Sequence, residues 1–399
     1  TSWYQQPSLI NVYDIDDRYR YCLEEHLKSV GMKDPVLHLG AKHGDILKVE
    51  PHQLQTRCDF LVAGPPCPPW SSQGVRHSLK DTRAEVFLKI LEWVYYLIYF
   101  GGLIGVVLEN VPGIQKKRGN KESVMDMFMR VLKTHIPEFA WRVDTLDITG
   151  YMCPQTRKRV FLRGLRKKFA KEVPAPLPPF GRRTLREVLG KKCEHTKRSE
   201  LSENLQNNLL AFESKIRARF DCGTYVKEDV CIFHLDRAEN KVYDQIVSLN
   251  IAPTLTTRNK CLFVACVEGI TQNKPDAERE YFRYLTNAER LMLQGFPPAL
   301  ANDLPRYDAC RAAGNAFPVP GLIAVIHPML KAVSNSVETG IRFADWPPPD
   351  IIQKGALANF KKFQKALREK PKSVPKKQRV IDVNLGIYFR IAIHRFCLL

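Results

Sequence analysis

The stretch Gly64-Pro65-Pro66-Cys67-Pro68-Pro69-Trp70-Ser71 decides how the rest of this 399-residue chain is interpreted. It follows the apolar run 60–63, which predicts a short buried strand ended by glycine and proline. A cysteine at the carboxyl end of such a strand lies where open α/β sheets place their chemistry, on a loop stiffened by four prolines. Cys67 alone is equally well explained as a small buried hydrophobe, because a lone cysteine identifies no family.

Two later stretches carry polar groups at the ends of further predicted strands. The apolar run 106–108 leads directly into Glu109-Asn110-Val111. Further along, Gln155-Thr156-Arg157-Lys158-Arg159 places alternating basic side chains just before a third strand at 160–162. A thiol, a carboxylate and two guanidinium groups at neighbouring strand ends can converge on one polar heterocycle.

This ordered set of a Pro-Cys loop, Glu-Asn-Val and Gln-x-Arg-x-Arg resembles the cytosine-5 DNA methyltransferases. The resemblance covers residues 10–170 and 283–330. It implies an α/β fold: a mostly parallel, doubly wound sheet of the class I S-adenosylmethionine-dependent methyltransferase type, with a smaller irregular target-recognition domain. The implied boundaries are a catalytic domain at 1–170, a target-recognition domain at 171–280, a return to the catalytic domain at 281–334 and a basic tail at 335–399.

The resemblance also implies a mechanism. Cys67 would add as a thiolate to carbon 6 of cytosine, which makes carbon 5 nucleophilic enough to take a methyl group from S-adenosylmethionine. Glu109 would protonate or hydrogen-bond N3, so we expect a raised pKa for this carboxyl group. Arg159, together with Arg157, would hold the base oxygen and lower the thiol pKa. In duplex DNA the cytosine must first be flipped out of the stack.

Cofactor contacts are implied mainly near the start of the chain. Asp14 follows a predicted strand at 10–13 and would bind the ribose hydroxyls, while Ile15 would pack against adenine. From the residues alone, Asp14 is equally well explained as a helix N-cap. Asp45 would accept a hydrogen bond from the adenine amino group, and Ile46 would supply an apolar face. The remaining implied cofactor contacts are Pro66, Val86, Asn315 and Ala316.

Three features depart from the family pattern. Pro68 stands where glutamine usually follows the nucleophile, and Phe317 stands where a small aliphatic residue is usual. No glycine-rich strand-turn motif precedes Asp14. We therefore expect half of the methionine and ribose pocket to lack its wall in the chain as given.

Composition and charge bear on the partners and the compartment. A net charge of +19 and a pI near 9.4 indicate a polyanionic partner. Eleven scattered cysteines without a CxxC spacing argue against a disulfide framework or zinc ribbon, so we predict a reducing compartment and no metal site. The apolar run 93–108 is broken by Gly101-Gly102 and is too short for a comfortable membrane span. We expect a soluble chain with no membrane partner.

Basic residues concentrate in two regions. In the predicted target-recognition domain, a positive surface is expected from Arg182, Arg183, Lys191, Lys192, Lys197 and Arg198. Ten basic residues and one acid lie between Lys354 and Arg379, which suits nucleic-acid binding or nuclear import. A solvated tail explains this second region equally well. Within it we predict a helix from Asp350 whose apolar face is formed by Leu357, Phe360, Phe363 and Leu367.

Three functions compete at this level. The first is methylation of cytosine in duplex DNA. The second is the tRNA-directed branch of the same family, although the residues after Cys67 lack its Cys-Phe-Thr signature. The third is a catalytically inactive DNA-binding relative with an incomplete cofactor pocket. The joint presence of Cys67, Glu109, Arg157 and Arg159 argues against this third function. The first function predicts a nuclear location in a eukaryote and a cytoplasmic one otherwise; the sequence indicates neither the oligomeric state nor the target sequence.

Overall fold

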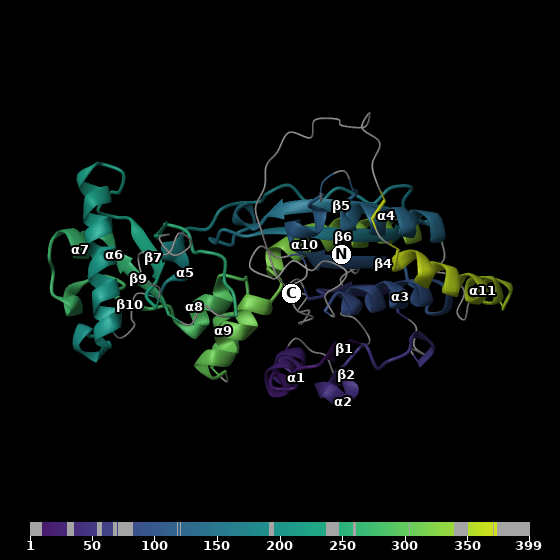
Figure 1. Cartoon of the computed structure of the whole chain (residues 1–399), viewed down its shortest axis with the longest axis horizontal. Coiled ribbons are helices and arrows are strands. Elements are labelled where there is room, and N and C mark those ends of the chain that lie inside the picture. Colours follow the sequence, from purple (N-terminus) through teal and green to yellow (C-terminus); the bar gives the residue numbers. More distant parts are fainter. Residues whose placement is uncertain are drawn as a thin grey trace. The chain divides into compact units, whose positions relative to one another are not determined.

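The protein forms two compact units in a computed structural model (Figure 1). The structure describes residues 10–29, 36–53, 58–66, 70, 83–117, 119, 121–190, 195–236, 247–257, 261–302, 304–338, 350–369 and 371–372. Cys67, Lys191 and Lys192 lie outside these residues. The first unit consists of 1–146, 158–178 and 321–399, and the second of 147–157 and 179–320. The chain thus passes between the units four times.

A four-stranded mixed sheet lies at the centre of the first unit. In sheet order its strands are β3 (Phe60–Ala63), β4 (Gly105–Asn110), β6 (Lys158–Arg166) and β5 (Phe139–Asp147). Strand β3 runs parallel to β4, and β6 runs antiparallel to it. A separate parallel pair is formed by β1 (Asn11–Asp14) and β2 (Val36–Leu39). The predicted α/β fold is confirmed.

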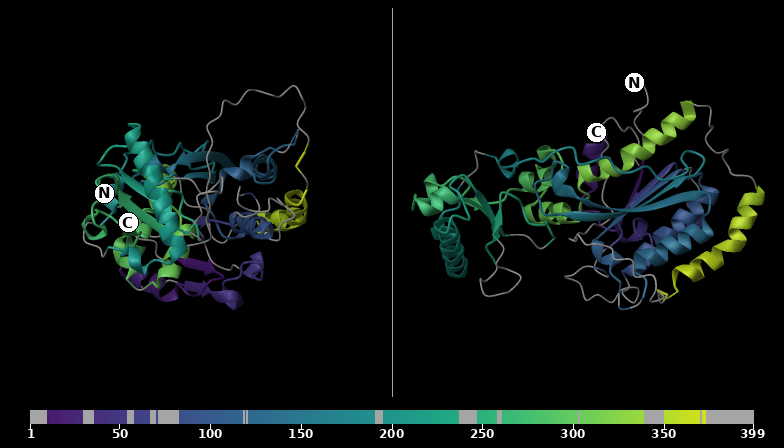
Figure 2. Two further views of the ribbon diagram at one scale, coloured as in Figure 1. Left: turned by 60° about the vertical axis from the view of Figure 1, so that its left-hand side comes forward. Right: turned by 90° about the horizontal axis from the view of Figure 1, so that it is seen from above.

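Helices cover both faces of this sheet (Figure 2). One face packs against α3 (Ala84–Phe100) and α4 (Val124–His135), and the other against α10 (Val319–Glu338). Strand β4 is fully buried, as its apolar sequence predicts. Helix α11 (Asp350–Leu367) packs on the outer side of α3 and α4. The pair β1–β2 is accompanied by the helices α1 (Arg20–Ser29) and α2 (Gly40–His43).

The second unit has its own core around an antiparallel sheet. In sheet order its strands are β10 (Arg283–Tyr284), β9 (Leu262–Cys266), β7 (Val230–His234) and β8 (Ser248–Leu249). Helix α6 (Glu203–Asp221) packs Phe212 against Phe233, with 4.5 Å between the ring centroids. The shorter helices are α5 (Leu185–Val188), α7 (Val267–Thr271), α8 (Asn287–Met292) and α9 (Arg306–Asn315).

The glycines that break the apolar run 93–108 separate a helix from a strand. Helix α3 ends at Phe100, Gly101 caps it, and β4 begins at Gly105. Thr286 and Glu289 form a capping box at the start of α8. The prediction of a buried strand at 60–63 is only partly right. Residues 60–62 are half-buried, because β3 pairs with β4 on one side and with no described strand on the other.

Other predictions need correction. The region 171–280 is not irregular, since it contains α6 and three of the four strands of the second sheet. Residues 350–367 are not a solvated tail, because α11 buries Phe363 completely. Leu357, predicted on the apolar face of this helix, is 62% exposed, and Ala356 is buried instead. The predicted domain boundaries stay a prediction; the compact units place residues 281–320 in the second unit and begin the return to the first at Gly321.

Among the described residues, one stretch is long and apolar enough to cross a membrane by length and composition alone. It runs from Tyr307 to Val337 and includes most of α9 and α10. Within its most apolar window, 56% is buried inside the protein.

Candidate active site

The antiparallel pairing of β4 and β6 brings Glu109 and Arg159 together in the first unit. Asn110 lies opposite Val160, and Glu109 lies opposite Phe161, so β6 begins where β4 ends. Arg159 therefore reaches the Glu109 carboxylate as a diagonal neighbour on the same face, and the two side chains form an ion pair. Glu109 lies at the carboxyl end of its strand. Arg159 instead lies at the amino end of its strand, because β6 runs in the opposite direction.

This ion pair is completely buried. Both side chains have 0% exposure to solvent. A buried charge of either sign is costly unless its partner is present, so each side chain depends on the other for a stable position. The raised pKa expected for Glu109 stays a prediction.

The loop that carries Cys67 is fixed to the segment that follows Glu109. Cys67 itself lies outside the described residues, but residues on both sides of it are described. The Asn110 side chain donates a hydrogen bond to the Pro65 carbonyl at 3.2 Å, and its Oδ1 accepts one from the Val111 amide at 2.8 Å. On the other side, a Cβ at Gly113 would lie 1.9 Å from the Trp70 carbonyl oxygen. Only glycine permits that approach.

Cys58, which precedes β3, contrasts with the predicted nucleophile. Burial, reinforced by the nearby Asp59 carboxylate, raises the pKa of the Cys58 thiol to about 12. Its Sγ donates to the Phe60 carbonyl at 3.4 Å. A thiol held protonated in this way is a poor nucleophile at neutral pH.

Arg157 is engaged in the second unit. Its Nη1 donates to the Leu255 carbonyl at 3.2 Å, and its Nη2 donates to the Ala316 carbonyl at 2.9 Å. Its side chain is completely buried. These contacts link the segment at 252–257 to the residues that follow α9. In this structure Arg157 therefore holds two stretches of main chain, a role that the sequence did not indicate.

Two glutamines that the sequence analysis did not select complete this cluster. The Gln155 side chain donates to Gln294 Oε1 at 3.1 Å, and Gln294 donates to the Ala313 carbonyl at 2.6 Å. Both side chains have 0% exposure. The alternation of residues 155, 157 and 159 along an extended segment was the signal for Gln155, because alternate side chains point to one side. Gln294 carried no comparable signal.

The predicted ribose site fits an adenosine group at the end of β1. Asp14 is 7% exposed, and its Oδ1 accepts a hydrogen bond from the Asp16 amide at 2.8 Å. Ile15, the next residue, is 60% exposed. A Cβ at Gly44 would lie 1.8 Å from the Asp14 carbonyl oxygen, so glycine is needed to keep that turn beside the carboxylate. A buried acid next to an exposed apolar side chain suits a ribose and an adenine ring.

The other predicted cofactor residues are placed differently. Asp45 accepts a hydrogen bond from the Leu47 amide at 3.1 Å, so its carboxylate is turned into its own loop. Ile46 is 5% exposed and belongs to the core of the first unit, instead of offering an open apolar face. Val86 packs against that same core. Pro66 is half-buried, and the remaining two, Asn315 and Ala316, belong to the second unit.

One position in the expected strand order has no described strand. With β1 as the second strand of a doubly wound sheet of order 3-2-1-4-5, β2, β3 and β4 take positions 3, 4 and 5. The position between β1 and β3 then belongs to the first strand, and no described strand pairs with either of those edges. Tyr13 of β1 and Leu61 of β3 both pack against the core that includes α3.

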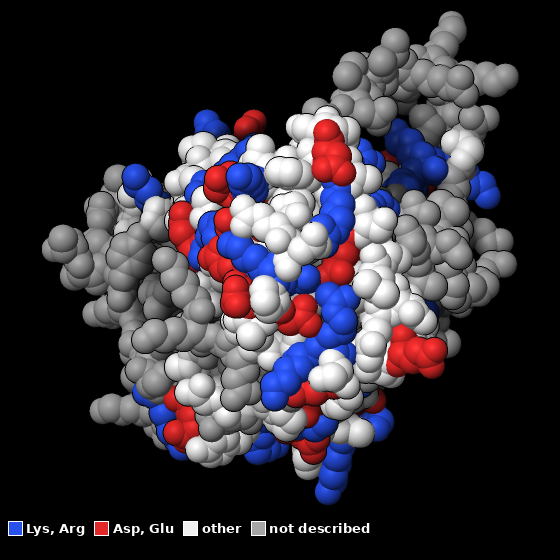
Figure 3. Space-filling view, turned by 90° about the vertical axis from the view of Figure 1, so that its left-hand side faces the viewer, with Lys and Arg blue, Asp and Glu red and all other residues white. Residues whose placement is uncertain are grey.

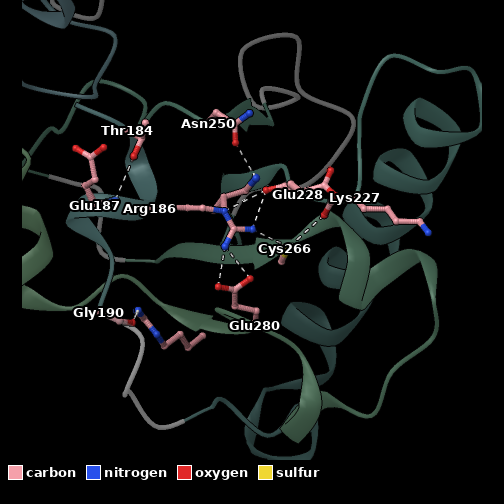
Figure 4. Close-up of polar contacts among 11 residues, drawn as sticks. Thr184, Arg186, Glu187, Gly190, Lys227, Glu228, Asn250, Cys266 and Glu280 are labelled. Carbon is pink, nitrogen blue, oxygen red and sulfur yellow. Dashed lines mark hydrogen bonds and ion pairs between the residues drawn. The ribbon is translucent and has the colours of Figure 1, made fainter. Parts of the chain in front are cut away.

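Three of the basic residues predicted at 182–198, Arg183, Lys197 and Arg198, form ion pairs with acidic side chains of the second unit. Arg198 pairs with the buried Glu213 at 2.8 Å, and Lys197 pairs with Glu200 at 3.7 Å. Figure 3 shows basic and acidic side chains intermixed on this face. Arg186 binds both oxygens of Glu280 at 2.7 and 2.8 Å and also the Glu228 carbonyl (Figure 4). These arginines hold the unit together.

Comparisons with known proteins identify the family of this chain. The family model for C-5 cytosine-specific DNA methylase matches residues 37–331. The type II methyltransferase M.MthTI of Methanothermobacter thermautotrophicus is 26% identical over 77% of this chain and 87% of its own. M.HpaII of Haemophilus parainfluenzae is 24% identical over 73% and 78%. The solved Entamoeba histolytica methyltransferase EhMeth is 15% identical over 82% and 98%, with a TM-score of 0.44, which is too low to carry an argument.

The family match covers most of the chain, and it includes the strands that bear Glu109 and Arg159. Along the chain, the Cys67 loop follows β3, Glu109 lies in β4 and Arg159 lies in β6. The chain belongs to the C-5 cytosine-specific DNA methylase family.

Proposed function

We propose that Cys67 is the nucleophile of this enzyme and that Glu109 and Arg159 hold the target base. As a family member the protein is a DNA (cytosine-5-)-methyltransferase, and S-adenosylmethionine is its methyl donor. The Cys67 thiolate forms a bond to carbon 6, and the displaced electron pair makes carbon 5 nucleophilic. After carbon 5 has been methylated, it loses its proton. The bond between sulfur and carbon 6 then breaks, which restores the aromatic ring and the thiolate.

One observation carries this assignment. Residues on both sides of Cys67, at Pro65 and Trp70, are fixed to the Asn110–Gly113 segment that directly follows Glu109. The Glu109 carboxylate would interact with N3, and the Arg159 guanidinium beside it would bind the base oxygen. Fixing these groups to one another lowers the cost of ordering them when the base arrives.

Asp14 and Ile15 would hold the adenosine part of the methyl donor. When bound, S-adenosylmethionine supplies an electrophilic methyl group. The buried Asp14 carboxylate would accept from the ribose hydroxyls, and the exposed Ile15 would cover the adenine ring. Arg157 would act indirectly, by holding the Ala316 main chain.

The substrate we propose is a cytosine flipped out of duplex DNA, and tRNA is the competing substrate. Methyl incorporation into duplex DNA and into tRNA should be compared at the same salt concentration, because phosphate contacts make both affinities salt-dependent. Preferential methylation of tRNA would reverse this proposal.

Covalent trapping tests the role of Cys67. DNA that contains 5-fluorocytosine should form a stable adduct, because fluorine at carbon 5 is not lost as a proton is. The assay uses the 399-residue chain and, in parallel, the same chain with a relative's glycine-rich first strand placed before it. An adduct is expected where the methyl donor is bound, because trapping requires methyl transfer. Cys67→Ser should abolish it and Cys58→Ser should not; an adduct that survives Cys67→Ser would disprove the assignment.

A further inference from the structure

Helix α11 is fixed to the first unit by one face. Ala356 is 5% exposed, and Phe363 and Leu367 are completely buried. The Tyr95 hydroxyl of α3 donates to the Ala356 carbonyl at 3.0 Å, and its ring stacks on Phe363 with centroids 4.6 Å apart. The side of α11 formed by Ala356, Phe363 and Leu367 is therefore used in packing inside the protein.

The contacts also set the direction of α11. Its early residue Ala356 lies beside Tyr95 in the second half of α3, whereas Arg368, just past its end, binds Glu85 at 3.3 Å and Glu92 at 2.7 Å. Helix α11 is thus antiparallel to α3, and its carboxyl end lies near the start of α3.

The carboxyl end of α11 lies toward the edge of the sheet at which Glu109 is found, which we call the catalytic edge. The other end of α3 lies near the amino ends of the parallel strands, because the Gly101 carbonyl accepts from the Cys58 amide at 2.9 Å. The start of α3 is therefore near the carboxyl ends, where Glu109 is found. Beyond α11, the Lys372 carbonyl accepts a hydrogen bond from the Glu122 amide at 2.9 Å.

Three lysines form a line on the outer face of α11. At 3.6 residues per turn, Lys361 and Lys365 lie within about 20° of Lys354 around the helix axis, and Phe363 lies about 180° away. All three lysines are exposed. Among the described residues no acid pairs with any of them, whereas Arg368 takes up both Glu85 and Glu92. At 1.5 Å per residue the line is about 16 Å long.

We propose that this lysine line binds the phosphate backbone of duplex DNA beside the target site and leads it toward the catalytic edge. The proposal rests on DNA being the substrate. The charges are spaced along one side of a rigid helix, and a line of about 16 Å spans roughly five base pairs at 3.4 Å each. A membrane surface fits poorly, because an interfacial helix needs a free apolar face and that of α11 is buried. The contact carries no sequence information, so it adds affinity without choosing the target.

The salt dependence of binding tests this surface without requiring methyl transfer. The full chain and the triple variant K354Q/K361Q/K365Q should be titrated with a duplex at several salt concentrations. Each lost phosphate contact should reduce the slope of log K against log salt by about 0.9, so the variant should lose roughly 2 to 3. The triple Lys→Arg variant should keep the original slope, because it retains the charge.

A matched control removes three lysines from the other edge of the same unit. Lys133, Lys167 and Lys171 are exposed and line a shallow depression near the start of β5. Their triple Lys→Gln variant has the same net charge as the α11 variant and should keep the slope. An equal loss in both variants would show a general charge effect and would overturn the proposal. So would an unchanged slope in a folded α11 variant, or a loss seen with anionic vesicles or tRNA and not with duplex DNA.

The experiments can contradict the proposed function and the α11 proposal independently of each other. Circular dichroism checks that each variant is folded, and the binding assay uses a duplex without a methyl donor. If Cys67→Ser left the trapped adduct intact while the α11 variant lost slope, the catalytic assignment would fail and the DNA-binding surface would stand.

Discussion

Arg157 and Arg159 are two residues apart in one motif, yet they are used in different ways. Arg159 pairs with the Glu109 carboxylate in the first unit, where the chemistry is expected. Arg157 binds the carbonyls of Leu255 and Ala316 in the second unit. Both side chains are completely buried. The comparison shows that one alternating motif supplies a charged group to the reaction centre of the first unit and a structural link within the second unit.

The two arginines differ in the groups that their guanidinium groups bind. Arg159 faces a full negative charge, so removing either member of the pair leaves a buried charge without its partner. Arg157 donates to two main-chain carbonyl oxygens, so its loss removes those hydrogen bonds. We therefore expect changes at the first pair to affect catalysis and stability together, and changes at Arg157 to affect mainly stability.

The largest effect is expected for Glu109→Gln. It should lower the free energy of unfolding by about 3–5 kcal/mol, because Arg159 loses its buried counter-charge. Methyl transfer should fall by about 10²-fold or more, since a general acid–base group is removed. Urea unfolding and methyl incorporation measure the two effects. The double variant E109Q/R159Q should recover stability without activity; recovery of activity would show that the pair is only structural.

Arg157→Met should have a smaller effect on stability and little effect on the chemical step. Loss of two hydrogen bonds from a charged group should lower the free energy of unfolding by about 2–4 kcal/mol. Under conditions where the variant is folded, kcat should stay close to that of the unmodified enzyme. A folded Arg157→Met variant with a kcat reduced 10³-fold would place Arg157 at the base and would end the distinction between the two arginines.

Asn110→Ala tests the link between the catalytic carboxylate and the Cys67 loop. Loss of the hydrogen bond to the Pro65 carbonyl should cost about 1–2 kcal/mol of stability. A loosened loop misplaces the nucleophile, so kcat should fall by about 10- to 100-fold while the KM for DNA stays similar. Asn110→Asp keeps the acceptor for the Val111 amide and serves as a partial control. Equal changes in kcat and KM would contradict a positioning role.

The smallest perturbation is chemical labelling of cysteines between pH 7 and 9. Burial raises the pKa of Cys58 in the first unit and of Cys153 in the second to about 12, so both should stay protonated and resist iodoacetamide throughout this range. The exposed Cys222 should react before both of them, because its hydrogen bond with Thr224 lowers its pKa. Mass spectrometry of the labelled peptides gives the order. Fast labelling of Cys58 would show that this strand opens to solvent.

Local sequence patterns predicted the elements and the chemical groups of the site. The apolar run at 106–108, the glycine turn before it and the polar residues after it placed Glu109 correctly at the end of a strand. The direction of β6 did not follow, because strand pairing between residues some fifty positions apart leaves no local periodic signal.

The sequence did not indicate which charged residues form ion pairs either. Arg198 and the lysines of α11 look alike in sequence, but only the fold brings Glu213 to Arg198 and leaves the three lysines exposed. The second unit also contains a buried Arg279 that binds the same glutamate, at a separation of 66 residues. Charge counts therefore indicated a polyanionic partner but could not indicate which residues remain available to it.

The discontinuous first unit has a consequence for synthesis on the ribosome. Residues 179–320, which are 142 residues by subtraction, separate its sheet from the helices α10 and α11. At about 5–20 residues per second, their translation takes on the order of ten seconds. During that interval the outer side of α3 and α4 and the face of the sheet that packs against α10 are exposed, because α10 and α11 have not yet been translated. The nascent chain should therefore be a substrate for chaperones over this interval, and slow codons within 179–320 would extend it.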